Sequence, residues 1–203
     1  MVTLAQVARE WFGTAGAPDG APAARRRLAA LERARLIRRQ RLLWHAPSLV
    51  TCTTSGAKLV SSPLAPYVPR LFDLEHDLEV VDIACAVTRR HPEGSWITER
   101  ELRAGRVMLP MQKRDYLHLP DGVFEWAGSR RVAFELDRTP KSSARYERLL
   151  IDYLDAFARG ELSGLVWVVS NDSLARRIEA TIREQRAADV ASVVVWSGEL
   201  FTW

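Results

Sequence analysis

The sequence contains little cysteine: Cys52 and Cys85 are the only two in 203 residues, and they lie far apart without a partner motif. Such a pair supplies neither the disulfide framework of a small secreted domain nor the ligands of a structural zinc site. The sequence also lacks an apolar run of bilayer length and a signal-peptide core at its N-terminus. We therefore expect a cytoplasmic protein with free thiols and no membrane association.

Internal repeats and histidine-based metal motifs are also missing. Apart from a loop rich in glycine, alanine and proline at residues 13–22, no segment has low complexity. None of the four histidines has the spacing of metal ligands, and His76 and Asp77 point apart if they are neighbours on a helix. These absences favour an ordinary globular protein of one or two domains.

The charge is moderately basic, and its distribution is uneven. The formal net charge is +4 and the pI is about 9.4, so the location of the basic residues matters more than their total. A proline-rich stretch at residues 61–69 has neither helical nor strand periodicity and is typical of a linker. We expect two domains, at residues 1–62 and 70–203.

The first expected domain has the element order of a winged helix-turn-helix. Helical spacing covers residues 3–12, and Pro22 suits the first turn of a second helix over 23–35. A strand and turn at 36–45 and a returning strand at 49–53 follow, and 54–59 form a closing turn or helix. In a winged helix-turn-helix the second helix enters the major groove, and the hairpin touches the flanking backbone.

Arginine is concentrated in the expected second helix and hairpin. Eight arginines lie between Arg25 and Arg41, against the single acid Glu32. Such a stripe binds phosphates of double-stranded DNA with a steep dependence on salt. The alternatives are a solvated arginine-rich helix, or a module for dimerisation or partner docking. We expect a homodimer, since winged-helix regulators commonly read two half-sites. The expected DNA-contact residues are Arg25, Arg26, Arg27, Arg33, Arg39 and, at the hairpin tip, Trp44.

The second expected domain alternates helix and strand, which predicts an α/β domain with a central mixed sheet covered by helices. Thr98 is followed three residues later by Glu101, the pattern of a capped helix start. Helices are expected at residues 71–88, 98–103, 142–159 and 173–186, and strands at 116–119, 123–126, 131–136, 165–169 and 192–196.

Acidic residues are expected at the ends of two neighbouring strands. Asp121 follows Pro120, and Glu135 and Asp137 end the strand after the hairpin, with Lys141 just beyond. Carboxylates held this closely suit a hard divalent cation. The alternative is structural: Asp121-Gly122 is a good turn sequence, and the other acids can pair with neighbouring arginines or Lys141.

This element order and these acids resemble the PD-(D/E)XK nuclease-like fold. The resemblance implies that Asp121 and Glu135 bind Mg²⁺ and that the protein hydrolyses a phosphodiester. Glu79 or Glu75, from the helix expected at residues 71–88, would complete the metal shell. In that family a lysine follows the glutamate by two residues, but here that position is Asp137. Lys141 is the nearest substitute, and it would stabilise the charge that develops on the phosphate.

Several sequence blocks stand in one order along the chain, at residues 28–56, 75–82, 98–103, 120–122, 134–142 and 145–146. On these blocks the chain as a whole also resembles the replication-relaxation proteins of mobile genetic elements. The resemblance implies a role in plasmid or integrative-element replication, relaxation or transcriptional regulation. We favour a DNA-binding protein with an inactive nuclease-like domain. The alternatives are a metal-dependent DNA endonuclease or nickase, and a self-associating protein-interaction scaffold.

Overall fold

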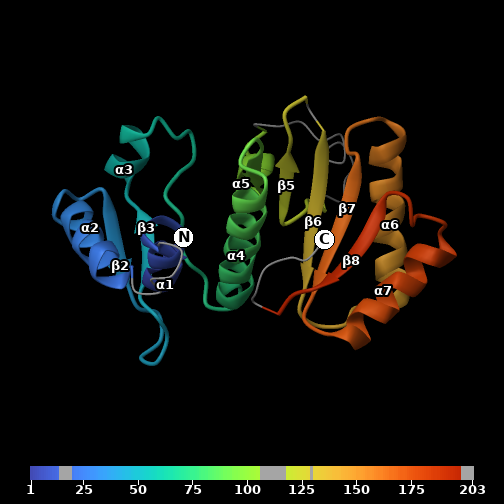
Figure 1. Cartoon of the computed structure of the whole chain (residues 1–203), viewed down its shortest axis with the longest axis horizontal. Coiled ribbons are helices and arrows are strands. Elements are labelled where there is room, and N and C mark those ends of the chain that lie inside the picture. Colours follow the sequence, from blue (N-terminus) through green and yellow to red (C-terminus); the bar gives the residue numbers. More distant parts are fainter. Residues whose placement is uncertain (14–19, 106–117, 129, 198–203) are drawn as a thin grey trace. The chain divides into compact units, whose positions relative to one another are not determined.

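The computed structural model describes residues 1–13, 20–105, 118–128 and 130–197 (Figure 1). The chain divides into two compact units, residues 1–85 and 86–203, which meet within helix α4 (Leu74–Arg90). Between Ser62 and Arg70 the chain forms no helix or strand, as its proline content predicts. The structure has mixed α/β architecture, as we expected. No helix among these residues is long and apolar enough to span a bilayer.

The first unit is built around a small antiparallel sheet with the strand order β1-β3-β2. Helices α1 and α2 cover it, and Ala24 and Leu28 of α2 are buried against Val7 and Val50. A π-helical turn, Ala8–Phe12, extends α1. The other elements are β1 (Val2–Thr3), α1 (Leu4–Val7), α2 (Ala21–Arg33), β2 (Ile37–Gln40), β3 (Leu49–Cys52) and α3 (Thr54–Leu59).

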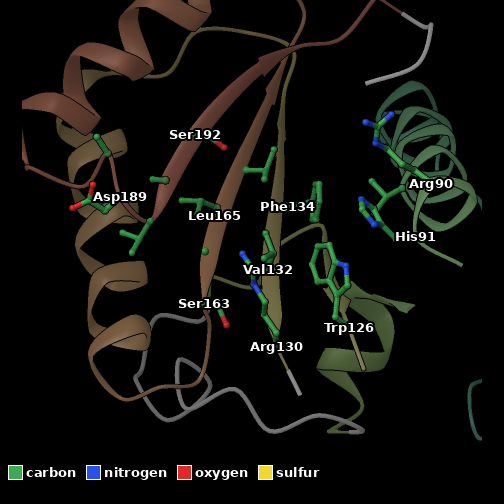
Figure 2. Close-up of a pocket in the computed structure, with 16 residues that line it drawn as sticks. Arg90, His91, Trp126, Arg130, Val132, Phe134, Ser163, Leu165, Asp189 and Ser192 are labelled. Atoms are coloured by element: carbon green, nitrogen blue, oxygen red, sulfur yellow. The ribbon is translucent and has the colours of Figure 1, made fainter. Parts of the chain in front are cut away.

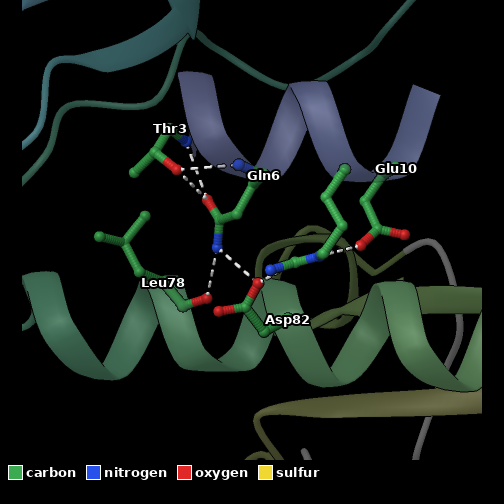
Figure 3. Close-up of polar contacts among 6 residues, drawn as sticks. Thr3, Gln6, Glu10, Leu78 and Asp82 are labelled. Atoms are coloured by element: carbon green, nitrogen blue, oxygen red, sulfur yellow. Dashed lines mark hydrogen bonds and ion pairs between the residues drawn. The ribbon is translucent and has the colours of Figure 1, made fainter. Parts of the chain in front are cut away.

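Gln6 connects α1 to the first half of α4, which explains why that half belongs to the first unit (Figure 3). Its Oε1 accepts the backbone N–H of Thr3 at 2.8 Å. Its Nε2 donates to the carbonyl of Leu78 at 2.9 Å and to Asp82 at 3.0 Å. Arg9 also donates to Asp82. A buried amide with all these partners fixes α4 against α1.

The second unit contains a five-stranded mixed sheet with the order β4-β5-β6-β7-β8. Strands β4, β5 and β6 form an antiparallel meander, and β7 and β8 add in parallel to β6. The parallel connections run through α6 and α7, as parallel pairing requires. The elements are β4 (Ser95–Thr98), α5 (Glu99–Arg103), β5 (Gly122–Glu125), β6 (Arg131–Asp137), α6 (Ser143–Ala158), β7 (Gly164–Val169), α7 (Asp172–Glu184) and β8 (Ala191–Val195).

The main core of this unit lies between α6 and α7 and one face of the sheet. Tyr146, Leu150 and Tyr153 of α6 pack there with Trp167 of β7, all fully buried. Successive side chains of a strand point to opposite faces. The acids Glu135 and Asp137 of β6 therefore face this core with Ala133, whereas Val132 and Phe134 face the other way.

Two expectations about the meander need correction. The strand expected at residues 116–119 falls partly outside the described residues, and its described part, His118 and Leu119, forms no strand. Asp121 therefore does not end a strand but immediately precedes β5. The first strand of the meander is instead β4, which pairs with β5 from Ser95↔Glu125 to Thr98↔Gly122.

Candidate functional site

Helix α2 presents arginine side chains to solvent in the first unit. Arg25, Arg26, Arg27 and Arg33 are all exposed, while Ala24 and Leu28 of the same helix are buried. Among the described residues the structure gives these four arginines no acidic partner. Their charges are therefore not neutralised within the described part of the unit, and they remain available to an anionic partner.

The other two expected DNA-contact residues differ from this group. Arg39 lies on β2 and donates from Nε to Oε2 of Glu32 at 2.7 Å, so part of its charge is neutralised by α2. This pair lowers the pKa of Glu32, through the hydrogen bond from Arg39. Trp44, between β2 and β3, is 90% exposed, which matches the expectation of an exposed ring at the hairpin tip.

In the second unit the structure brings Asp121 close to β6. The backbone N–H of Leu136 donates to Oδ2 of Asp121 at 2.7 Å. Because Leu136 lies between Glu135 and Asp137, this bond holds the Asp121 carboxylate beside the acidic end of β6. The negative charge of Asp121 is one of the factors that act on the pKa of Glu135. Asp121 and Glu135, expected to lie together, are thus neighbours.

Glu135 is buried and already has two side-chain partners. His118 Nε2 lies 2.6 Å from its Oε1, and the hydroxyl of Tyr153 donates to the same oxygen. Burial raises the pKa of Glu135, against the opposing effect of His118. Burial alone would lower the pKa of His118, but the hydrogen bond and charge of Glu135 outweigh it, and the pKa is raised.

Lys141 lies against the second acid of β6. Its ammonium group forms an ion pair with Oδ1 of Asp137, a residue that is only 3% exposed. The backbone N–H of Lys141 donates to the hydroxyl of Tyr146 at 3.0 Å, which fixes the turn that leads into α6. The ion pair between Lys141 and Asp137 was one of the structural alternatives for these residues, and the structure confirms it.

The third expected metal ligand lies elsewhere in the chain. Glu79 belongs to the half of α4 that forms part of the first unit. Within the described residues no group of three or more His, Cys, Asp or Glu side chains is arranged to hold a metal ion. Oδ2 of Asp137 is buried and has no hydrogen-bond partner in the same part of the chain.

Sequence reasoning missed two residues of this cluster, His118 and Tyr153. His118 lies 17 positions before Glu135, and Tyr153 lies 18 positions after it. The available signals were weak: His118 stands three residues before Asp121, and Tyr153 lies within the helix expected at residues 142–159. Their convergence on Glu135 depends on how α6 and the segment before β5 pack against β6, which no local pattern reveals.

Comparisons with protein-family models, with curated proteins and with solved structures found no match.

Proposed function

We propose that this chain binds double-stranded DNA through α2, as the second helix of a winged helix-turn-helix. The observation that carries the proposal is the exposed arginine group Arg25, Arg26, Arg27 and Arg33, to which the described part of the chain gives no acidic partner. An arginine on an exposed helix face reaches phosphate oxygens with up to five N–H donors. Several such contacts release counterions and supply most of the affinity for DNA.

The arrangement of the first unit supports the winged-helix interpretation. Helix α2 is followed by the β2-β3 hairpin, and β1 adds to the other side of β3. In this interpretation the hairpin, with exposed Trp44 near its tip, flanks α2 where it would touch the DNA backbone. Membership of the replication-relaxation family, and a role in plasmid or integrative-element replication, relaxation or regulation, belong to the same proposal.

The test is a fluorescence-anisotropy titration of a labelled duplex at about 50 mM salt, where phosphate contacts contribute strongly. The variant replaces Arg25, Arg26 and Arg27 with alanine, and we expect affinity to fall by at least about tenfold. The matched control replaces Arg148, Arg176 and Arg183, which are equally exposed on α6 and α7. Equal losses in both triple variants would show that α2 makes no particular contribution.

A second candidate function is metal-dependent cleavage of DNA by a nuclease-like second unit. The observation that favours it is Oδ2 of Asp137, which is buried on the same face of β6 as Glu135 and has no hydrogen-bond partner among the described residues, with Asp121 beside them. These carboxylates are the residues that would hold Mg²⁺, which acidifies a bound water when present. The fit is partial, because no trio of ligands is arranged among the described residues.

A plasmid-nicking assay with Mg²⁺ or Mn²⁺ tests this second candidate. The nuclease proposal predicts nicking by the wild-type protein and none by Asp121→Asn or Glu135→Gln, each checked for folding by thermal melting. If the wild-type protein nicks no faster than these variants, the second unit is not a nuclease. That result leaves DNA binding by α2 unaffected.

A further inference from the structure

The second unit contains a pocket on the sheet face opposite the acid cluster. It has a volume of about 400 Å³, within the range that holds a small organic ligand (Figure 2). Strand alternation separates it from the acids: Phe134 points into the pocket, whereas its neighbour Glu135 points to the core on the other face. The pocket is therefore independent of both functions proposed above.

The floor of the pocket is apolar and built on rigid strands. Phe134 of β6, Val166 of β7 and Ser192 of β8 are direct neighbours across the sheet. Val132 of β6 and Val87 of α4 add further buried apolar surface. Such a floor suits the flat face of an apolar or aromatic ring.

One wall of the pocket is aromatic. The rings of His91 and Trp126 meet edge to face with their centroids 5.3 Å apart. Figure 2 shows His91 projecting from the end of α4 toward Trp126, with Phe134 beside them. Trp126 is held in place by Phe124, whose centroid lies 4.5 Å away. This wall offers a preformed edge against which a planar ring packs.

The rim carries more positive than negative charge. Arg90 and Arg130 are exposed and line the pocket from α4 and from the β5-β6 hairpin. The described residues give neither arginine an acidic partner. Arg130 instead lies over the Trp126 ring, 5.7 Å from its centroid. The one acid that lines the pocket, Asp189, lies on the far side from Arg90 and His91 (Figure 2).

We propose that this pocket binds a mononucleotide, with its base on the apolar floor beside Trp126 and its phosphate at Arg130, the arginine that lies over the Trp126 ring. A planar heterocycle matches the aromatic wall, and a dianionic phosphate matches the exposed guanidinium of Arg130, to which the described residues give no acidic partner. Hydroxyls of Ser163 and Ser192, also in the lining, suit the polar edges of a nucleoside.

Isothermal titration calorimetry with adenosine and cytidine 5′-monophosphates tests the proposal on the full chain. We expect at least one of them to bind with a dissociation constant below about 1 mM. Arg130→Ala should weaken that binding about tenfold, the loss of one charge-assisted contact, whereas Arg90→Ala, at another end of the lining (Figure 2), should weaken it by less than about twofold. Both residues are exposed, so neither change disturbs the fold.

Further variants and ligands test the contributions of the floor, the base and the phosphate separately. Ser192→Trp fills the floor and should abolish binding, whereas Arg148→Ala, on α6 away from the pocket lining, should leave the dissociation constant unchanged. Inorganic phosphate alone and the nucleoside alone should each bind at least about tenfold more weakly than the nucleotide. Absence of binding by both nucleotides, or wild-type affinity in Arg130→Ala, overturns the proposal.

Discussion

At the scale of single residues, the acid cluster at the end of β6 has an unusual environment. Glu135 and Asp137 are both nearly inaccessible to water, and each is compensated by a different partner. Glu135 bonds to His118 and Tyr153, and Asp137 pairs with Lys141. Burying a carboxylate is unfavourable unless such partners are present, so the partners are essential to the fold.

The raised pKa values of His118 and Glu135 make stability depend on pH. A raised folded-state pKa gives stability that is complete below the unfolded value and lost as pH rises through the folded value. For Glu135 the loss begins above its ordinary pKa of 4.5, and for His118 above 6.5. The free energy of unfolding in urea should therefore fall as the pH is raised above 4.5 and then above 6.5. The double variant His118→Gln/Glu135→Gln should flatten that slope, while the exposed His45→Gln should not.

Replacing Lys141 with methionine should destabilise the protein by about 2–4 kcal/mol, since it leaves a buried carboxylate unpaired. The figure is below that of a fully buried pair, because Lys141 is 23% exposed. Adding Asp137→Asn should recover most of the loss. If chemical denaturation shows the single variant to be as stable as wild type, Asp137 does not need the ion pair.

Gly122 is glycine because of close packing, and not because of a turn. A Cβ at this position would lie 2.1 Å from the ring of Trp96 on the neighbouring strand. Gly122→Ala should therefore displace Trp96 and destabilise the protein by about 1–3 kcal/mol in a thermal or urea melt. Gly128→Ala has open space around its Cβ but a φ of +94°, so it tests backbone strain alone.

Only part of this cluster could be predicted from the sequence. Lys141 lies four residues after Asp137, so the local sequence could predict that they pair. The Pro120-Asp121 sequence likewise pointed to the first acid of the cluster. His118 and Tyr153 could not be assigned to Glu135, because they lie 17 positions before it and 18 positions after it, in the segment before β5 and in α6. The pocket could not be predicted either, since its lining comes from segments as distant as Val87 and Ser192.

At the scale of elements, capping signals in the sequence predicted local structure well. Thr98 accepts the N–H of Glu101, and Glu101 returns a bond to the N–H of Thr98, the capping box expected at the start of α5. The helix and strand positions of α2, α6, β7 and α7 also agree with their periodicity to within a few residues. Strands β1 and β4 escaped prediction, because two to four residues show too little alternation.

Thr98→Ala removes the cap of α5 and should destabilise the protein by about 1 kcal/mol in chemical denaturation. Thr98→Ser retains a hydroxyl that can accept the same bond and should be close to wild type. Equal losses in the two variants would show that the cap itself contributes nothing measurable.

Gln6→Ala should weaken the contact between α4 and α1, and it should destabilise the protein more than Thr98→Ala does. It removes the bonds to Leu78 and Asp82 together with the capping bond to Thr3, and Gln6 is only 4% exposed. We expect a loss of about 2–4 kcal/mol, from several buried hydrogen bonds at once. Hydrogen exchange should become faster in α1 and in the first half of α4. Unchanged exchange in both helices would contradict this role.

At the scale of the whole molecule, the two units have distinct chemical character. The first presents an arginine surface, and the second combines a buried acid cluster with a separate apolar pocket on the other face of its sheet. A homodimer remains a prediction, and light scattering of the full chain tests it through the molar mass. Duplex DNA with two half-sites would then bind one dimer.

The salt dependence of DNA binding tests the central claim most directly. Each phosphate contact contributes about 0.9 to the slope of log K against log salt concentration. Removing Arg25, Arg26 and Arg27 should therefore reduce the magnitude of that slope by about 2 to 3, while the triple variant on α6 and α7 keeps the wild-type slope. The same slope for wild type and the α2 variant would contradict the account, because those arginines would then make no phosphate contacts.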